Sequence, residues 1–127
     1  MQELKRIVMD LDGTLTIDDS LLSYAEKLPN MDVVNLLHQY KIDGYEICIF
    51  TARNMQTHNS VLGKINAFTL PIIIDWLNKY NVPYDEIYVG KPWCGADGFY
   101  VDDKAIRPSE FLTKSKDEIK ALLKLEK

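Results

Sequence analysis

Four short apolar runs constrain the fold of this chain most, because each is only three or four residues long and so too short for a buried helix. Continuous apolar runs of this length are typical of parallel strands that are covered on both faces. Parallel strands also need crossover connections, which are usually helical. The pattern predicts an α/β, Rossmann-like three-layer domain with a mostly parallel sheet, whose strands lie at Ile7–Met9, Ile47–Phe50, Ile87–Val89 and Phe99–Val101.

Helix signals lie between and after these runs. Asn30 is suited to cap a helix with one apolar face, and Gly44 is suited to the position just past its end. Thr69, followed by a leucine and a proline, predicts the start of a second helix that stops near Pro83. A Ser-x-x-Glu capping box at 115–118 predicts a third helix at the carboxyl end of the sequence.

Composition limits the class of protein. The chain has 127 residues, of which 46% are hydrophobic and 27% charged, and this favours one globular domain over residues 1–127. The formal net charge of −4 disfavours non-specific nucleic-acid binding. No apolar run approaches the roughly 20 residues of a membrane-spanning helix. Because no secretion signal is recognisable and the two cysteines lack metal-ligand spacing, the expected location is the cytoplasm and no membrane partner is expected.

Polar residues suited to phosphate chemistry follow each predicted strand. Asp10 and Asp12 come after the first, Thr51 after the second, Lys91 after the third and Asp102–Asp103 after the fourth. Because ligands of open α/β sheets bind beyond the carboxyl ends of the strands, these residues are expected to meet in one pocket. Carboxylates there can hold Mg²⁺, while a hydroxyl and an ammonium group can hold phosphate oxygens. The sequence therefore predicts a site for a phosphate monoester.

The same residues, taken in order, resemble the four motifs of the haloacid dehalogenase superfamily of phosphohydrolases. The motifs are Asp10-Leu11-Asp12-Gly13-Thr14, Thr51, Lys91 with Pro92, and Asp102-Asp103, and the resemblance extends from Arg6 to about Pro108. The stretches 51–54 and 90–95 are also similar to small capsule biosynthesis phosphatases that lack a cap domain. The intervals between the motifs here leave no room for such a domain either.

The resemblance implies a role for each motif residue. Asp10 would attack phosphorus and form an aspartyl-phosphate. Asp12 would protonate the leaving alcohol and then activate water. Mg²⁺ would be held by the Asp10 carboxylate, the main-chain carbonyl of Asp12 and the Asp102 carboxylate, with Asp103 as a further candidate. The carboxylate at position 12 indicates phosphate ester hydrolysis rather than dehalogenation.

Further residues are expected to contact the phosphate or the rest of the substrate. Thr51 and the backbone around Gly13 would donate hydrogen bonds to the phosphoryl group, and Lys91 would stabilise its developing charge. Arg53 can bind anionic oxygens in bidentate fashion. For Lys64, in the loop after Asn54, the alternative to substrate contact is a solvated loop. The full set of predicted substrate contacts, beyond the catalytic residues, is Leu11, Gly13, Thr14, Ala52, Arg53, Asn54 and Lys64.

An open site without a cap would admit a phosphorylated small molecule or a glycan. The resemblance to capsule phosphatases favours a phosphorylated sugar in the synthesis of a capsular or surface polysaccharide. A homo-oligomer is left open, in which residues 54–68 would cover the site of a neighbour. Two other functions also stay open: a receiver-like module that accepts one phosphate, and a phosphosugar-binding module without turnover. Catalytic turnover separates the enzyme from both.

Overall fold

The structure, a computed structural model, describes residues 3–126 and divides into two compact units, Met1–Trp93 and Cys94–Lys127. The single domain over residues 1–127 stays a prediction. The first unit contains β1 (Arg6–Met9), η1 (Tyr24–Glu26), α1 (Met31–Ile42), β2 (Glu46–Phe50), α2 (Leu62–Lys64), η2 (Ile65–Thr69), α3 (Leu70–Lys79) and β3 (Glu86–Tyr88). The second unit contains α4 (Pro108–Thr113) and α5 (Lys116–Lys124).

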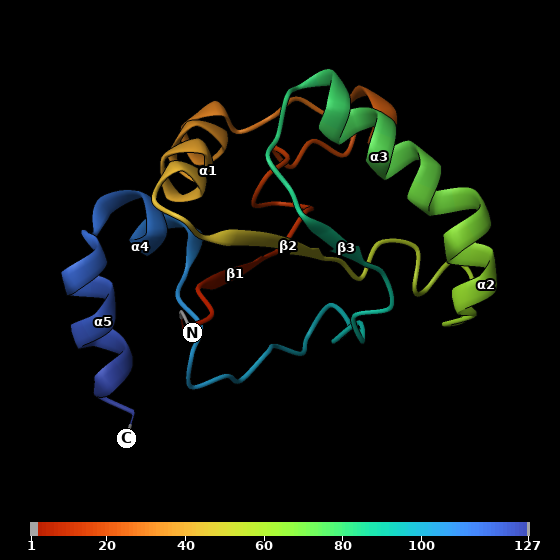
Figure 1. Ribbon diagram of the computed structural model, residues 1–127. Coiled ribbons are helices and arrows are strands. Elements are labelled where there is room, and N and C mark those ends of the chain that lie inside the picture. The colour runs from red at the N-terminus through yellow and green to blue at the C-terminus, as the bar shows by residue number, and fades with distance from the viewer. Residues whose placement is uncertain (1–2, 127) are drawn as a thin grey trace. The chain divides into compact units, whose positions relative to one another are not determined.

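The three strands form one parallel sheet in the order β1-β2-β3 (Figure 1). Ile7 lies opposite Ile47, and Ile49 lies opposite Ile87. Between β1 and β2 the chain passes through α1, and between β2 and β3 it passes through α3, as parallel neighbours require. The α/β architecture with a parallel sheet and helical crossovers is confirmed for this unit.

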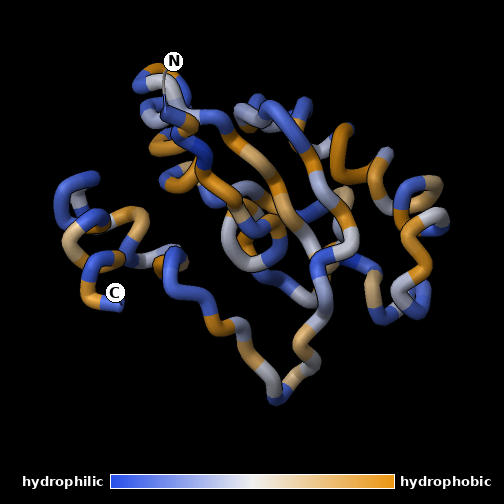
Figure 2. The backbone as a smooth tube through the Cα atoms, turned by 60° about the horizontal axis from the view of Figure 1, so that its bottom comes forward, coloured by the Kyte–Doolittle hydropathy of each residue, from blue (hydrophilic) through white to orange (hydrophobic). Residues whose placement is uncertain are grey.

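One face of the sheet carries the core. Ile47 and Ile49 are completely buried, and α1 and α3 lie on the same side of the sheet (Figure 1). The other face is exposed at the two outer strands, where Val8 is 59% and Tyr88 is 51% exposed, whereas Cys48 of β2 is buried. The expectation that the apolar strands are buried on both faces is therefore wrong for β1 and β3. Figure 2 shows the short hydrophobic stretches separated by hydrophilic ones along the backbone.

Helix α1 forms where the sequence predicts it. The Asn30 side chain accepts a hydrogen bond from the Val33 amide at 3.5 Å, which satisfies one of the free donors of the first turn. The helix ends at Ile42, and Gly44 follows with a φ of 93°, a left-handed conformation that glycine adopts without steric cost. The buried residues of α1 are Val33, Val34, Leu37 and Tyr40.

The second predicted helix, α3, begins at Leu70 directly after Thr69, as expected. The sequence did not predict that α2 and η2 lead into α3 without a break from Leu62. The five residues of η2 form a π-helical turn directly before α3. Pro71 has no amide with which to continue an α-helical ladder, and the run accommodates it just after this wider turn.

The fourth predicted strand is absent from the described residues. Phe99–Val101 is irregular, and its side chains are between 50% and 88% exposed. The apolar character of three residues does not make a strand, because a strand needs a hydrogen-bonded partner edge that the run itself cannot supply.

The second unit also contains one confirmed and one unexpected helix. Ser115 and Glu118 cap α5 reciprocally, with N···O distances of 3.2 and 2.9 Å, as their spacing predicts. Helix α4, which is not among the predicted helices, starts after Arg107, whose amide donates to Glu110 Oε1 at 2.9 Å. Within the described residues, no helix has the length and apolar character needed to cross a membrane.

Candidate active site

The turn that follows β1 fixes the first two aspartates. The carbonyl of Leu11 accepts the amides of residues 14, 15 and 16 at 3.3, 2.9 and 3.1 Å, which folds the chain back on itself. Gly13 occupies this turn with a φ of 79°, and its amide donates to Thr16 Oγ1 at 3.2 Å. A residue with a side chain would be strained at that φ. Asp10 and Asp12 therefore sit at the carboxyl end of β1 in a turn that needs glycine.

Asp10 lies between a cation and a hydroxyl. Its Oδ1 lies 3.7 Å from Lys91 Nζ, and its Oδ2 accepts a hydrogen bond from Thr14 Oγ1 at 3.1 Å. Burial raises the pKa of Asp10 above its ordinary value, although Lys91, Thr14 and the Leu11 amide oppose the shift. Asp12 adds a smaller repulsion in the same direction as burial.

Thr51 and Lys91 are joined to each other through the backbone. The Thr51 amide donates to the Tyr88 carbonyl of β3 at 3.0 Å, and the Thr51 carbonyl accepts the Lys91 amide at 3.1 Å. Thr51 is buried, and its hydroxyl oxygen accepts the Arg53 amide at 3.0 Å. The structure thereby brings Asp10, Thr51 and Lys91 to one edge of the sheet.

Arg53, predicted to bind substrate, is placed on Asp12. Its Nε donates to Asp12 Oδ2 at 3.0 Å and its Nη2 donates to Asp12 Oδ1 at 2.8 Å. Its guanidinium carbon lies 4.2 Å from the centre of the Tyr24 ring, and Lys27 Nζ lies 5.4 Å from the same centre. The Arg53 side chain is 1% exposed, whereas that of Asp12 is 31% exposed. Of this bidentate pair, Arg53 is therefore buried and only Asp12 is accessible to solvent.

The other predicted substrate contacts have different surroundings. The Asn54 amide group is used at both ends, since Oδ1 accepts from Thr69 Oγ1 at 2.8 Å and Nδ2 donates to Thr57 Oγ1 at 3.3 Å. Asn54 also has a φ of 60°, so it turns the chain just after Arg53. Leu11 is fully buried and Ala52 half-buried, while Lys64 is exposed on α2.

The predicted metal ligands fall into both units. Asp10 and Asp12 belong to the first. Asp102 and Asp103 belong to the second, where both are exposed and Asp102 Oδ1 accepts the Lys104 amide at 2.8 Å in a local turn. Across residues 3–126, no group of three or more His, Cys, Asp or Glu side chains is arranged to hold a metal ion. A metal site that joins Asp102 and Asp103 to Asp10 stays a prediction.

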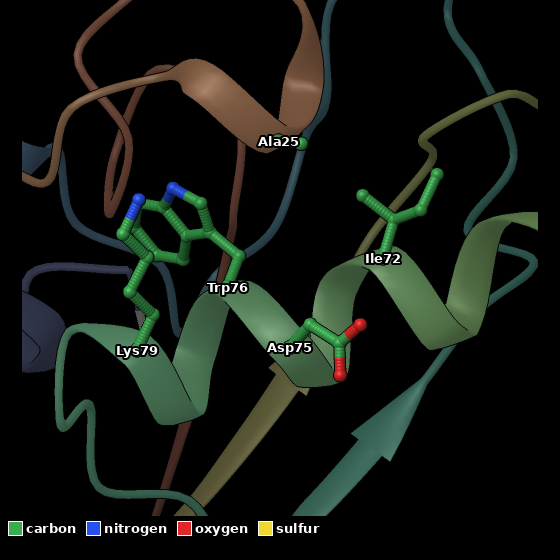
Figure 3. Close-up of a pocket in the computed structure, with 5 residues that line it drawn as sticks. All are labelled: Ala25, Ile72, Asp75, Trp76 and Lys79. Carbon is green, nitrogen blue, oxygen red and sulfur yellow. The ribbon is translucent and has the colours of Figure 1, made fainter.

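A shallow groove of about 270 Å³ also lies in the first unit (Figure 3). Trp76 and three neighbours line it from α3, and Ala25 contributes from η1. Trp76 itself is held in place by its Nε1, which donates to the Lys27 carbonyl at 2.7 Å. None of the lining residues is a predicted site residue; they are Ala25, Ile72, Asp75, Trp76 and Lys79.

Comparison with known proteins shows the family to which the chain belongs. No protein-family model matches the chain, and no curated protein matches it significantly. The crystal structure of an MCSG target from Vibrio cholerae is 54% identical, covers 98% of this chain and 100% of its own, and has a TM-score of 0.93. This chain belongs to the family of that Vibrio cholerae protein. A chain of the Pnkp1/Rnl/Hen1 complex is also similar, with 25% identity over 90% of this chain, 36% of its own length and a TM-score of 0.53.

Sequence reasoning missed two residues that shape the site. Tyr24 supports Arg53 through its ring, and Thr69 holds Asn54 through its hydroxyl. Tyr24 lies in the long stretch between β1 and α1, where no periodicity marks it. A helix cap accounts equally well for a threonine before Leu-Pro, which is the position of Thr69. No local signal in the sequence distinguishes these roles.

Proposed function

We propose that this protein is a Mg²⁺-dependent phosphatase that hydrolyses a phosphate monoester through an aspartyl-phosphate on Asp10. The observation that carries the proposal is the setting of Asp10, which ends β1 with Lys91 at 3.7 Å, Thr14 at 3.1 Å and Asp12 two residues away. A carboxylate, an ammonium group and a second carboxylate at the carboxyl edge of a parallel sheet form a chemically complete set for phosphoryl transfer.

The chemistry would proceed in two displacements. An oxygen of Asp10 forms a bond to phosphorus while the ester P–O bond breaks, and Asp12 transfers its proton to the departing oxygen. Water then attacks the aspartyl-phosphate, gives its proton to Asp12, and releases phosphate and the Asp10 carboxylate. Lys91 would neutralise charge on the transferring group in both displacements.

The residues around Asp10 fit a divalent cation. Burial raises the pKa of Asp10 despite Lys91, so an added cation would favour the ionised, nucleophilic form. The carboxylate of Asp10 and the main-chain carbonyl of Asp12 are hard oxygen donors, and Asp102 is the further carboxylate that the family resemblance assigns. When bound, Mg²⁺ would supply charge that lets a phosphate dianion approach two carboxylates.

The substrate proposed is a phosphorylated sugar, by analogy with the capsule phosphatases that the sequence resembles. Release of phosphate is measured from sugar phosphates, nucleotides and simple phosphate esters, in Mg²⁺ and in chelator, for the wild type and for Asp10→Asn. The proposal expects turnover that requires Mg²⁺ and falls by at least about 10³-fold in Asp10→Asn. Asp75→Asn, an exposed carboxylate on α3, is the matched control and should retain full activity.

Two results would contradict this function. Incorporation of a single phosphate without release would indicate the receiver-like module. Tight binding of a sugar phosphate without hydrolysis by the folded, Mg²⁺-loaded protein would indicate the binding module.

A further inference from the structure

Arg53 is placed to hold Asp12 rather than to collect a ligand from solution. Only 1% of its side chain is exposed, so the guanidinium does not present an open face to solvent. Its Nε and Nη2 donate to the two different oxygens of one carboxyl group, at 3.0 and 2.8 Å. A bidentate pair of this kind fixes the plane of the carboxyl group as well as its position.

Two further contacts hold Arg53 itself in place, and a third supports Tyr24. The guanidinium carbon of Arg53 lies 4.2 Å from the centre of the Tyr24 ring, a cation–π contact. The Arg53 amide donates to the Thr51 hydroxyl at 3.0 Å. Lys27 lies on the same ring and is 3.7 Å from Asp18, so a second cation supports Tyr24. The orientation of Asp12 is therefore determined through Arg53 by residues of η1 and of the turn after β2.

We propose that Arg53 is the positioning residue for Asp12 and does not itself bind the phosphate or the rest of the substrate. The inference rests on the proposed phosphatase function. In the first displacement the new bond joins an Asp10 oxygen to phosphorus, the ester P–O bond breaks, and the proton of Asp12 moves to the leaving oxygen. Arg53 uses one lone pair on each Asp12 oxygen and leaves another for that proton, and it neither gains nor loses a proton itself.

This role has a kinetic signature that depends on the leaving group. A good leaving group such as 2,4-dinitrophenolate departs without a proton, so a misplaced Asp12 costs it little. A sugar alcohol or phenol needs the proton, so it should lose most of the contribution of general-acid catalysis. A residue that binds the phosphate would instead slow all esters alike, because the phosphoryl group is the same in each.

The test compares kcat/KM of the wild type and Arg53→Lys for 2,4-dinitrophenyl phosphate, 4-nitrophenyl phosphate, phenyl phosphate and a sugar phosphate in Mg²⁺. Lysine keeps the charge but cannot make the bidentate pair. We expect a loss of about 10²-fold for phenyl phosphate and the sugar phosphate, and of less than about threefold for 2,4-dinitrophenyl phosphate. A plot of kcat/KM against the pKa of the leaving group should be steeper for the variant. Arg6→Lys is the matched control, because Arg6 also makes a two-nitrogen pair, at 3.3 and 3.0 Å, with Glu46 outside the site.

The outcomes separate this inference from the function on which it rests. An equal loss for all esters, or an increase in KM alone, would overturn the positioning role while leaving the phosphatase intact. Absence of turnover by the wild type would overturn the phosphatase and this inference with it. If circular dichroism shows that Arg53→Lys does not fold, Tyr24→Leu provides the same test, since it removes the cation–π contact and should give a smaller loss with the same dependence on the leaving group.

Discussion

At the scale of single residues, Asp10 shows a conflict between stability and chemistry. Burial raises the pKa of its carboxyl group. A raised pKa does not stabilise the folded protein at neutral pH, so a purely structural role does not explain it. Lys91 and Thr14 compensate for part of this cost. A side chain that is costly to ionise at the carboxyl end of a strand is typical of functional sites.

The effect of the Asp10 charge on the free energy of unfolding can be measured with Asp10→Asn. Because the folded-state pKa is raised, the folded protein binds more protons than the unfolded chain between the ordinary and the raised value, so stability falls as pH rises through that window. In chelator at neutral pH, we expect Asp10→Asn to be more stable than the wild type, by under about 1 kcal/mol because solvent screens a partly exposed group. The difference should disappear below the ordinary carboxyl pKa.

Thermal unfolding of both proteins at a series of pH values in chelator provides the measurement. A variant that is less stable than the wild type at neutral pH would contradict the prediction. Added Mg²⁺ should stabilise the wild type more than Asp10→Asn, because binding to the folded state alone raises its stability.

At the scale of elements, Asp85 connects α1 to the sheet through hydrogen bonds. Its carboxylate contacts Lys41 Nζ of α1 at 2.5 and 2.7 Å and accepts the Ile47 amide of β2 at 2.8 Å. The hydrogen bond with Lys41, followed by that with the Ile47 amide, lowers the pKa of Asp85. One side chain just before β3 therefore joins a helix to the neighbouring strand.

We expect Asp85→Ala to lose about 1–2 kcal/mol of stability at pH 7, because it removes charged hydrogen bonds and leaves the Ile47 amide without its side-chain acceptor. Since the folded-state pKa is lowered, the contribution of Asp85 is complete above the ordinary carboxyl pKa and is lost as pH falls through the lowered value. Urea unfolding should therefore show a difference in the free energy of unfolding between the wild type and Asp85→Ala that is smaller at acid pH than at neutral pH. A difference that does not change with pH would contradict the role of the charge. Lys41→Met should lose less stability than Asp85→Ala, because the hydrogen bond from the Ile47 amide remains.

The π-helical segment η2 connects the long helical run to the turn beside the site. Thr69, its last residue, is buried and donates to Asn54 at 2.8 Å. Asn54 is held with a φ of 60°, which is unfavourable without such support. Elements distant from the sheet edge thereby determine the conformation of the residue that follows Arg53.

For Thr69→Val, we expect kcat/KM for phosphate esters to fall by about threefold to tenfold and stability to fall by about 1 kcal/mol, because the shape is retained but the hydrogen bond is lost. Initial rates and urea unfolding provide the measurements. Thr113→Val is the matched control, because it removes a helical hydroxyl that donates to the Ser109 carbonyl in the second unit. Unchanged kinetics for Thr69→Val would show that Asn54 does not need this support.

At the scale of the whole molecule, the first unit contains nearly all of the buried apolar residues. Phe111 is the one member of the described buried hydrophobic set that lies after Trp93. The sheet and the helices α1 and α3 also lie before that boundary. The first unit therefore has its own core, as an independently folding segment requires.

We expect a fragment of residues 1–93 to fold, with a cooperative thermal transition and a near-ultraviolet circular dichroism signal from buried Trp76. Under the proposed function it should have no phosphatase activity, because Asp102 is missing. The full chain is the control for both measurements. A fragment that is unfolded would support one domain over residues 1–127, and an active fragment would remove Asp102 from the chemistry.

Local patterns in the sequence predict β1, β2, β3, α1, α3 and the cap of α5, because apolar runs and capping signals depend on residues close together in the chain. The convergence of Asp10, Thr51 and Lys91 followed from the general rule for parallel sheets. Tertiary structure alone decided that Arg53 binds Asp12, that Thr69 holds Asn54 and that Phe99–Val101 is not a strand. Each of these depends on a partner remote in sequence. A hydrogen bond or a strand pairing contributes free energy only when the fold brings both partners together, so local sequence does not predict it.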